Sequence, residues 1–170
     1  MYYLQKPPTP SVLTDALLKI RPTTMLSVPL IIEKVVNNRV KPTIAASKFL
    51  TYLQNHFPFL LYWLVGAKIK KMFGGRMRFF GIGGSKLDVE VERFLRKIRF
   101  PYAIGYGLTE TAPLICDAAP KKTHLGSTGT ASYGISVRLA DVNPDSGIGE
   151  LQVKGPNVML GYYKDYNRTK

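Results

Sequence analysis

At residues 106–111 the chain reads Tyr-Gly-Leu-Thr-Glu-Thr, which places an aromatic ring, a glycine, two threonine hydroxyls and a carboxylate within six residues. The stretch follows Tyr102-Ala103-Ile104, a short apolar run that predicts a β-strand. In α/β proteins, ligands bind where a strand ends in a glycine-rich polar loop. A ring can stack on a base, a hydroxyl can bond a phosphate, and a carboxylate can hold the Mg²⁺ that accompanies phosphates. The stretch therefore indicates a nucleotide site, and the alternative is an ordinary turn with Glu110 in solvent.

A second glycine-rich turn precedes this loop. Residues 78–82 predict a strand that runs into Gly83-Gly84-Ser85. An amphipathic helix is expected from Asp88 to Ile98, with acidic residues in its first turns and basic residues near its end, as the helix dipole favours. Pro101 stops that helix before the strand at residue 102. Strand, helix and strand in this spacing predict a βαβ unit with a right-handed crossover.

The N-terminal part predicts further helices around a buried strand. A helix is expected from Pro10 to Ile20, and residues 24–28 predict a buried parallel strand. Helices near 45–55 and 59–72 predict a hairpin that turns around Pro58. Phe59, Tyr62 and Trp63 lie at helical spacing in the second of these helices. Such a stripe most simply predicts core packing, while an acyl tunnel or a lipid-facing surface stays open as an alternative.

The pattern changes after about residue 120. Ile135, Val137 and Leu139 alternate with polar or small residues and predict a half-buried antiparallel strand. A turn is expected at 143–147, and the alternation resumes at 150–154. We therefore expect an α/β sheet subdomain over residues 1–120 and a partial β-rich subdomain over 121–170.

The chain of 170 residues has a formal net charge of +13, from 24 Lys and Arg against 11 Asp and Glu. The simplest explanation is that other segments of a longer protein offset this charge. Nucleic-acid binding is disfavoured because no nucleic-acid module accompanies the basic residues. Anionic lipid is the better specific partner, since a basic cluster directly follows the apolar stretch 57–67. We accordingly expect peripheral membrane contact through residues 57–78. The single cysteine, Cys116, fits a reducing compartment and most simply fills apolar space.

Four motifs in this order resemble the adenylate-forming acyl-CoA synthetases, also called AMP-binding enzymes. Residues 106–111 resemble the signature of that family, and residues 83–85 resemble its adenine-contacting turn. Residues 149–165 resemble the segment that precedes the ribose-binding aspartate. Residues 7–35 are similar to the long-chain fatty acid branch. The resemblance implies an α/β fold, a βαβ sheet subdomain of a synthetase N-terminal domain followed by the start of a small antiparallel β-barrel-like subdomain.

The resemblance also implies roles for single residues. Tyr106 would stack on adenine, Thr109 would bond the α-phosphate, and Glu110 would hold Mg²⁺. Thr109 and Glu110 are thus the expected catalytic pair. Ser85 would add a polar contact or cap the following helix. The expected nucleotide-binding set is Gly83, Gly84, Ser85, Gly105, Tyr106, Gly107 and Thr109.

Two further expectations concern glycines and connecting segments. Gly107 is expected to border the acyl pocket, where a side chain would narrow the tunnel. Gly126 to Gly129 and Asn157 to Tyr163 are expected to be mainly structural.

The function that the resemblance implies is ATP-dependent ligation of a long-chain fatty acid to coenzyme A through an acyl-AMP intermediate, with ATP, Mg²⁺ and fatty acid as partners. A fatty acyl-AMP ligase that serves a carrier protein is a close variant. A non-enzymatic basic module that binds membrane or nucleic acid is the alternative from another class. The family's phosphate loop, ribose-binding aspartate and catalytic lysine do not occur in these 170 residues. We therefore expect an internal fragment that is inactive alone, from a cytoplasmic enzyme with peripheral contact at the inner membrane surface.

Overall fold

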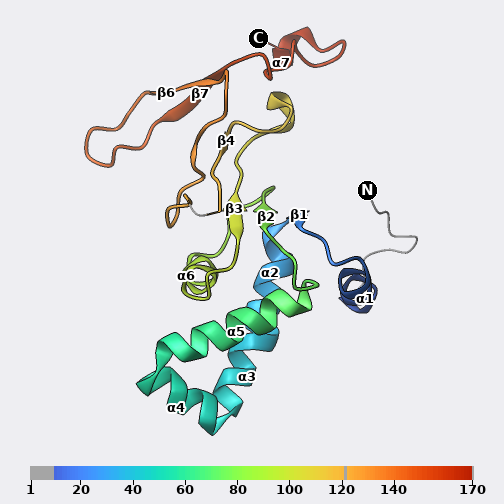
Figure 1. Cartoon of the computed structure of the whole chain (residues 1–170). Helices are drawn as coiled ribbons and strands as arrows, with labels where there is room; N and C mark the ends of the chain where they lie inside the picture. Colours follow the sequence, from blue (N-terminus) through green and yellow to red (C-terminus); the bar gives the residue numbers. More distant parts are fainter. Residues whose placement is uncertain (1–9, 121, 170) are drawn as a thin grey trace. The chain divides into compact units, whose positions relative to one another are not determined.

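The computed structural model describes residues 10–120 and 122–169, which form two compact units that divide between Ala103 and Ile104 (Figure 1). The expected short strand at residues 2–4 lies outside the described residues. The subdomain boundary expected at 120 stays a prediction.

A three-stranded sheet in the order β1-β2-β3 organises the first unit. Its strands are β1 (Thr24–Ser27), β2 (Phe79–Ile82) and β3 (Tyr102–Ile104). β1 runs parallel to β2, with Leu26 opposite Gly81. The prediction of a parallel strand here is confirmed, but the prediction that it is buried is wrong, because Leu26 is 78% exposed. β1 lies at the edge of this sheet, whereas β2 lies in the middle and is almost fully buried.

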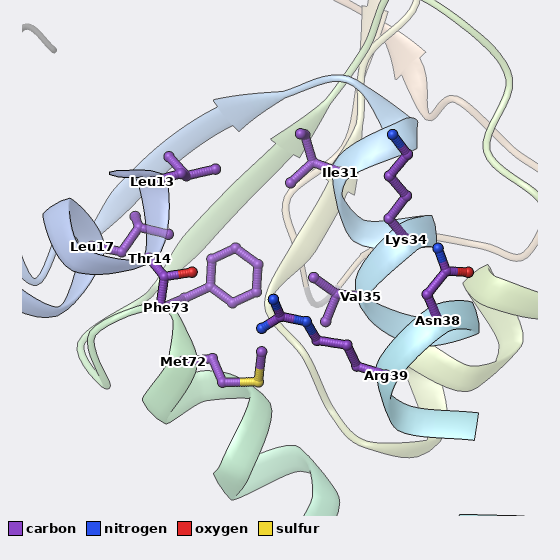
Figure 2. A pocket seen from close by; sticks show the side chains of 10 residues that line it. All are labelled: Leu13, Thr14, Leu17, Ile31, Lys34, Val35, Asn38, Arg39, Met72 and Phe73. Carbon is purple, nitrogen blue, oxygen red and sulfur yellow. The ribbon is translucent and has the colours of Figure 1, made fainter. Parts of the chain in front are cut away.

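Helices make up most of the first unit. Helix α1 (Pro10–Ile20) starts and ends where the sequence predicts. Helix α2 (Pro29–Val35) continues into the π-helical segment η1 (Val36–Val40) and then α3 (Lys41–Ala46). A cavity of about 310 Å³ lies between α1, α2, η1 and the end of α5 (Figure 2).

The expected helical hairpin is present as α4 (Lys48–His56) and α5 (Pro58–Met72). Its first helix starts later than predicted because the Ser47 hydroxyl caps it, accepting a hydrogen bond from the Leu50 N–H at 3.3 Å. Phe59 and Trp63 are 71% and 62% exposed, so the prediction that this stripe packs in the core is wrong. The core instead takes Leu61, Gly66 and Ile69 from the opposite side of α5.

Helix α6 (Val89–Lys97) connects β2 to β3, as predicted. Its N-cap is Asp88, whose carboxylate accepts a hydrogen bond from the Val91 N–H at 2.9 Å. Glu92, one of the acidic residues expected in the first turns of this helix, is only 1% exposed and accepts a hydrogen bond from the Tyr102 hydroxyl at 2.9 Å. A buried carboxylate is tolerated only with such partners.

The second unit is built from short strands and turns. Its elements are the 3₁₀ turn η2 (Thr109–Thr111), β4 (Cys116–Asp117), β5 (Thr130–Ala131), β6 (Ser136–Ala140), β7 (Glu150–Lys154) and α7 (Tyr166–Thr169). β4 pairs with β5, and β6 pairs with β7, both antiparallel.

The predicted antiparallel pairing of β6 and β7 is confirmed, and their strands do not close into a barrel within the described part of the chain (Figure 1). Leu139 is 53% exposed, so the prediction of a half-buried strand is wrong. The side chain is exposed because β6 and β7 form a two-stranded ribbon. The turn at 143–147 is confirmed, since the Asn143 side-chain oxygen accepts the N–H groups of Asp145 and Ser146. Among the described residues, no helix combines the length and apolar character needed to cross a bilayer.

Replacing Tyr102 by Phe should lower the free energy of unfolding by about 1–3 kcal/mol, because the buried Glu92 carboxylate loses a hydrogen-bond donor. Urea denaturation measures the change. Tyr62→Phe is the matched control, because its half-buried ring meets Phe94 edge-on and stays in place. Equal losses in the two variants would contradict the stabilising role of the Tyr102 hydroxyl.

Candidate functional site

The loop that carries the signature sequence is closed at its base by backbone pairing. The Tyr106 N–H donates to the Cys116 carbonyl at 2.9 Å, and the Cys116 N–H donates to the Tyr106 carbonyl at 3.0 Å. The Tyr106 side chain is 36% exposed and therefore accessible beside this pairing. The pairing with β4 thus fixes the backbone at Tyr106, whose ring is expected to stack on adenine by resemblance to the family.

Gly107 is required by the loop itself. A Cβ atom at this position would lie 1.6 Å from the Pro113 carbonyl oxygen, which is a backbone atom that cannot move aside easily. Any side chain here would force the loop open. Gly105 is less constrained, because its Cβ would meet only the flexible end of Leu114 at 3.1 Å. The expected role of Gly107 beside an acyl pocket stays a prediction.

Thr111 shapes the turn that presents Thr109 and Glu110. Its buried hydroxyl accepts a hydrogen bond from the Leu108 N–H at 3.0 Å and donates one to the Leu108 carbonyl at 2.9 Å. These bonds close the 3₁₀ turn η2. The Thr109 side chain remains exposed and that of Glu110 is half-buried, so both can reach a ligand. The sequence assigned no separate role to Thr111, because the usual capping pattern has Ser or Thr at the start of the turn and Glu or Gln three residues later.

Asn157 ties this loop to the segment that follows β7. Its side-chain N–H groups donate to the Thr111 carbonyl at 2.8 Å and to the Leu114 carbonyl at 2.9 Å. The Met159 N–H adds a third bond, to the Glu110 carbonyl at 2.8 Å. The Asn157 Oδ1 is buried without a hydrogen-bond partner in the described part of the chain. The amide therefore acts as a double donor, and the expected structural role of this segment includes holding the signature loop.

The Glu110 carboxylate is joined to the same segment. The Tyr162 hydroxyl donates to Glu110 Oε1 at 2.7 Å. This hydrogen bond lowers the pKa of Glu110 from its ordinary value, with a smaller contribution from a backbone N–H. The same bond raises the pKa of Tyr162, because it favours the neutral phenol. Glu110 is therefore held as a carboxylate at neutral pH, while Tyr162 keeps its proton.

The donor set around Glu110 fits a magnesium ion that is also bound by phosphates. Among the described residues no group of three His, Cys, Asp or Glu could enclose a metal ion. Mg²⁺ is commonly held by one or two carboxylates together with substrate phosphates and waters. One ionised carboxylate beside the exposed Thr109 hydroxyl is compatible with that mode of binding, and no closed protein cage is present in this part of the chain.

The double-glycine turn belongs to the first unit and follows β2. The Gly83 N–H donates to the Ser27 carbonyl at 3.1 Å, which extends the pairing of β1 and β2 by one bond. Gly84 has φ +89°, a conformation that side chains rarely adopt. A Cβ there would have only a Val28 methyl nearby, at 3.7 Å, so the outer side of the turn is open to a ligand. Ser85 is exposed and does not cap α6, because Asp88 does.

Cys116 is a poor candidate for a nucleophile. It is buried in β4, and burial raises the pKa of its thiol, so the reactive thiolate is disfavoured. The structural role expected for this residue agrees with its place opposite Ala131.

A family model described as AMP-binding enzyme matches residues 1–163. The chain belongs to this family. The AMP-binding chain is 33% identical to the peroxisomal long chain acyl-CoA synthetase 7 of Arabidopsis thaliana, over 93% of its own length and 26% of that protein. It is 38% identical to the chloroplastic long-chain-fatty-acid–[acyl-carrier-protein] ligase AEE15 of the same plant, over 52% of its length and 13% of that protein.

The fold of the AMP-binding chain is also found in solved structures. One is the o-succinylbenzoate coenzyme A synthetase of Bacillus subtilis in complex with ATP and magnesium ion, with a TM-score of 0.62 and 19% identity. That match covers 95% of this chain and 28% of the other. The chain thus spans less than a third of the length of these relatives and solved structures, and the expected α/β fold of the family is confirmed.

Asn157→Ala should loosen the signature loop, because two backbone carbonyls lose their donor. We expect hydrogen exchange of a peptide covering residues 106–116 to rise by about tenfold or more. Asn167→Ala, in the exposed helix α7, is the control and should leave this exchange unchanged. Unchanged exchange in the Asn157 variant would show that the loop is held by other contacts.

Tyr162→Phe should raise the pKa of Glu110 towards its ordinary value, because the largest cause of its lowering is removed. Stability contributed by the ionised Glu110 is present above the unfolded-state pKa and is lost as pH falls through the folded-state pKa. The variant should lack this pH-dependent contribution to stability. Carboxyl NMR titration measures the pKa, and Tyr163→Phe, whose side chain is 88% exposed, is the control. The interpretation fails if neither variant changes the pKa of Glu110.

Proposed function

We propose that the AMP-binding chain is the part of an ATP-dependent long-chain fatty acid–CoA ligase that positions the nucleotide. In the proposed reaction, a fatty acid carboxylate attacks the α-phosphate of ATP, which gives acyl-AMP and pyrophosphate. The thiol of coenzyme A then attacks the acyl carbonyl and releases AMP. The names of the relatives support the substrate class, and membership of the AMP-binding family supports use of the nucleotide.

The observation that carries the proposal is the tethered, ionised Glu110 beside the exposed Thr109. Adenylation chiefly requires positioning and neutralisation of charge on the phosphates. A turn held by Asn157 and the Met159 N–H can present these two side chains with little loss of freedom on binding. A mobile surface loop would have to be ordered first.

Each side chain of the loop has a proposed task. The accessible Tyr106 ring stacks on adenine, an interaction worth roughly 1–3 kcal/mol per base in single-stranded nucleic acid complexes. The Thr109 hydroxyl donates to the α-phosphate. The Glu110 carboxylate, which accepts the Tyr162 hydroxyl, would hold Mg²⁺ together with the phosphates. When bound, the ion neutralises phosphate charge and so favours attack by the fatty acid.

The remaining members of the predicted nucleotide-binding set are four glycines and Ser85. Gly83 and Gly84 are proposed to approach adenine closely, which the open outer side of Gly84 permits. Ser85 is exposed and can add a hydroxyl contact. Gly105 and Gly107 are proposed to keep the base of the signature loop narrow enough for the nucleotide to lie against Tyr106.

A second candidate differs only in the acceptor. The relative with 38% identity over half of the chain is named as an acyl-carrier-protein ligase. Coenzyme A and the carrier protein both offer a phosphopantetheine thiol. Incubation of the complete gene product with fatty acid, ATP and either acceptor separates the two, by which acceptor becomes acylated.

Glu110→Gln in the complete gene product should lower the rate of fatty-acid-dependent pyrophosphate release by orders of magnitude, because one charge that holds Mg²⁺ is removed. Folding should be unaffected, since the Tyr162 hydroxyl can still donate to the amide oxygen. Glu150→Gln, on the exposed strand β7, makes the same charge change away from the loop and should retain activity. An unchanged rate in Glu110→Gln would remove Glu110 from the proposed mechanism.

A further inference from the structure

The helical hairpin α4–α5 exposes an unusual amount of apolar surface. Residues 58–67 of α5 are apolar almost throughout, yet only Leu61 and Gly66 of this stretch are buried. Contiguous exposed apolar residues of this kind mark an interaction surface in a soluble protein. The large apolar side chains exposed on the hairpin are Phe49, Tyr52, Phe57, Phe59, Leu60, Trp63 and Leu64.

A pocket of about 290 Å³ adjoins this surface, between α5 and the end of α6. Its aromatic wall comes from α5 and its opposite wall from residues 97–99. Gly66 allows the close approach of the two elements, because a Cβ there would lie 2.6 Å from the Ile98 carbonyl oxygen. The aromatic and basic residues that line the pocket are Phe59, Tyr62, Trp63, Lys70, Lys97 and Arg99.

Three cations line this pocket. No carboxylate lies within ion-pair distance of Lys70, Lys97 or Arg99 among the described residues, where the ion pairs are Arg93–Glu90 and Arg168–Asp165. Two of the cations instead rest on aromatic rings. Lys97 Nζ lies 5.5 Å from the centre of the Tyr62 ring, and the Arg99 guanidinium lies 5.9 Å from that of Phe59. Such cations keep most of their charge available to an anion.

The backbone of Arg99 points to the same conclusion. It has φ +51°, the left-handed conformation in which glycine usually ends a helix. A residue with a side chain adopts this conformation only at a conformational cost. In this conformation the Arg99 guanidinium lies beside the aromatic wall of α5 and adds positive charge to the rim of the pocket.

We propose that the α4–α5 hairpin and the adjoining pocket form a docking surface for an anionic lipid bilayer. The exposed aromatic and leucine side chains would enter the region between headgroups and acyl chains, where aromatic side chains are favoured. The three cations would contact the lipid phosphates. This surface shares no residue with the proposed nucleotide-binding set and extends the proposed function, since it concerns where the protein works and not the reaction.

Other occupants fit the surface less well. If a second copy of the chain bound here, the cations of one copy would face the cations of the other. DNA would satisfy the cations, but it would leave Leu60 and Leu64 facing a polar backbone. An anionic bilayer complements both the positive charge and the apolar side chains, because it offers phosphates and hydrocarbon at adjacent depths.

Trp63 provides a direct probe, because it is the only tryptophan in the chain. The full chain is mixed with phosphatidylcholine vesicles, with or without phosphatidylglycerol, and binding is followed by co-sedimentation and by Trp63 emission. We expect binding and a blue shift only with the anionic vesicles, and both should weaken as salt rises. No binding, or equal binding to the neutral vesicles, would overturn the proposal.

The double variant Lys97→Gln/Arg99→Gln should weaken partitioning into anionic vesicles by about tenfold or more, since each basic residue near such a surface contributes on the order of 1 kcal/mol. Lys34→Gln/Arg39→Gln makes the same charge change at the other cavity of the first unit (Figure 2) and should alter binding by about twofold or less. Equal losses in the two double variants would show that net charge alone explains vesicle binding, and would overturn the proposed surface.

Phe59→Ser tests the apolar part of the surface while Trp63 reports. Its side chain is already exposed, so circular dichroism should be unchanged. We expect weaker vesicle binding and a smaller blue shift, and unchanged values of both would contradict insertion. Double-stranded DNA serves as the competing ligand. Binding to DNA at least as tight as to anionic vesicles, with the same sensitivity to Lys97 and Arg99, would assign the surface to nucleic acid.

Discussion

The signature loop depends on one side-chain amide. Asn157 donates two hydrogen bonds to carbonyls of a loop more than 40 residues earlier in the chain, and these carbonyls flank the reverse turn at Ala112. Ala112 itself has the left-handed φ of +50°, which a side chain adopts only when its surroundings hold it there. The bonds from Asn157 therefore support both the strained turn and the residues before it.

The same segment also sets the electrostatics of the loop. The Tyr162 hydroxyl donates to Glu110, which lowers the pKa of the carboxyl group further and orients one of its oxygens. A metal ion then meets a fixed acceptor, and a phosphate can meet the Thr109 hydroxyl. The chain uses local hydrogen bonds for this preorganisation instead of burial, since Thr109 stays exposed and Glu110 only half-buried.

Much of the fold follows from local sequence rules. Asp88, the amphipathic pattern and Pro101 predict α6 almost to the residue, and Pro58 predicts the turn between α4 and α5. Burial is harder to predict, because it depends on what packs against an element. Apolar Leu26 and Trp63 are exposed, while the charged Glu92 is buried against Tyr102, a residue ten positions away.

The candidate site could likewise be predicted only in part from the sequence. The residue types of 106–111 predict the chemistry of a nucleotide site, because ring, hydroxyl and carboxylate are recognisable in sequence. The contacts of Asn157 and Tyr162 could not be predicted, because they join segments far apart in the chain and leave no periodic signal. Asn157 lies in a glycine- and proline-containing stretch that reads as an ordinary connection.

A structure of the complete gene product with AMP and Mg²⁺ bound tests the central claim most directly. The account predicts the Tyr106 ring against adenine and the Glu110 carboxylate on the phosphate side, with both Asn157 hydrogen bonds retained. Adenine bound away from residues 106–114, or a nucleotide-bound loop released from Asn157, would contradict it.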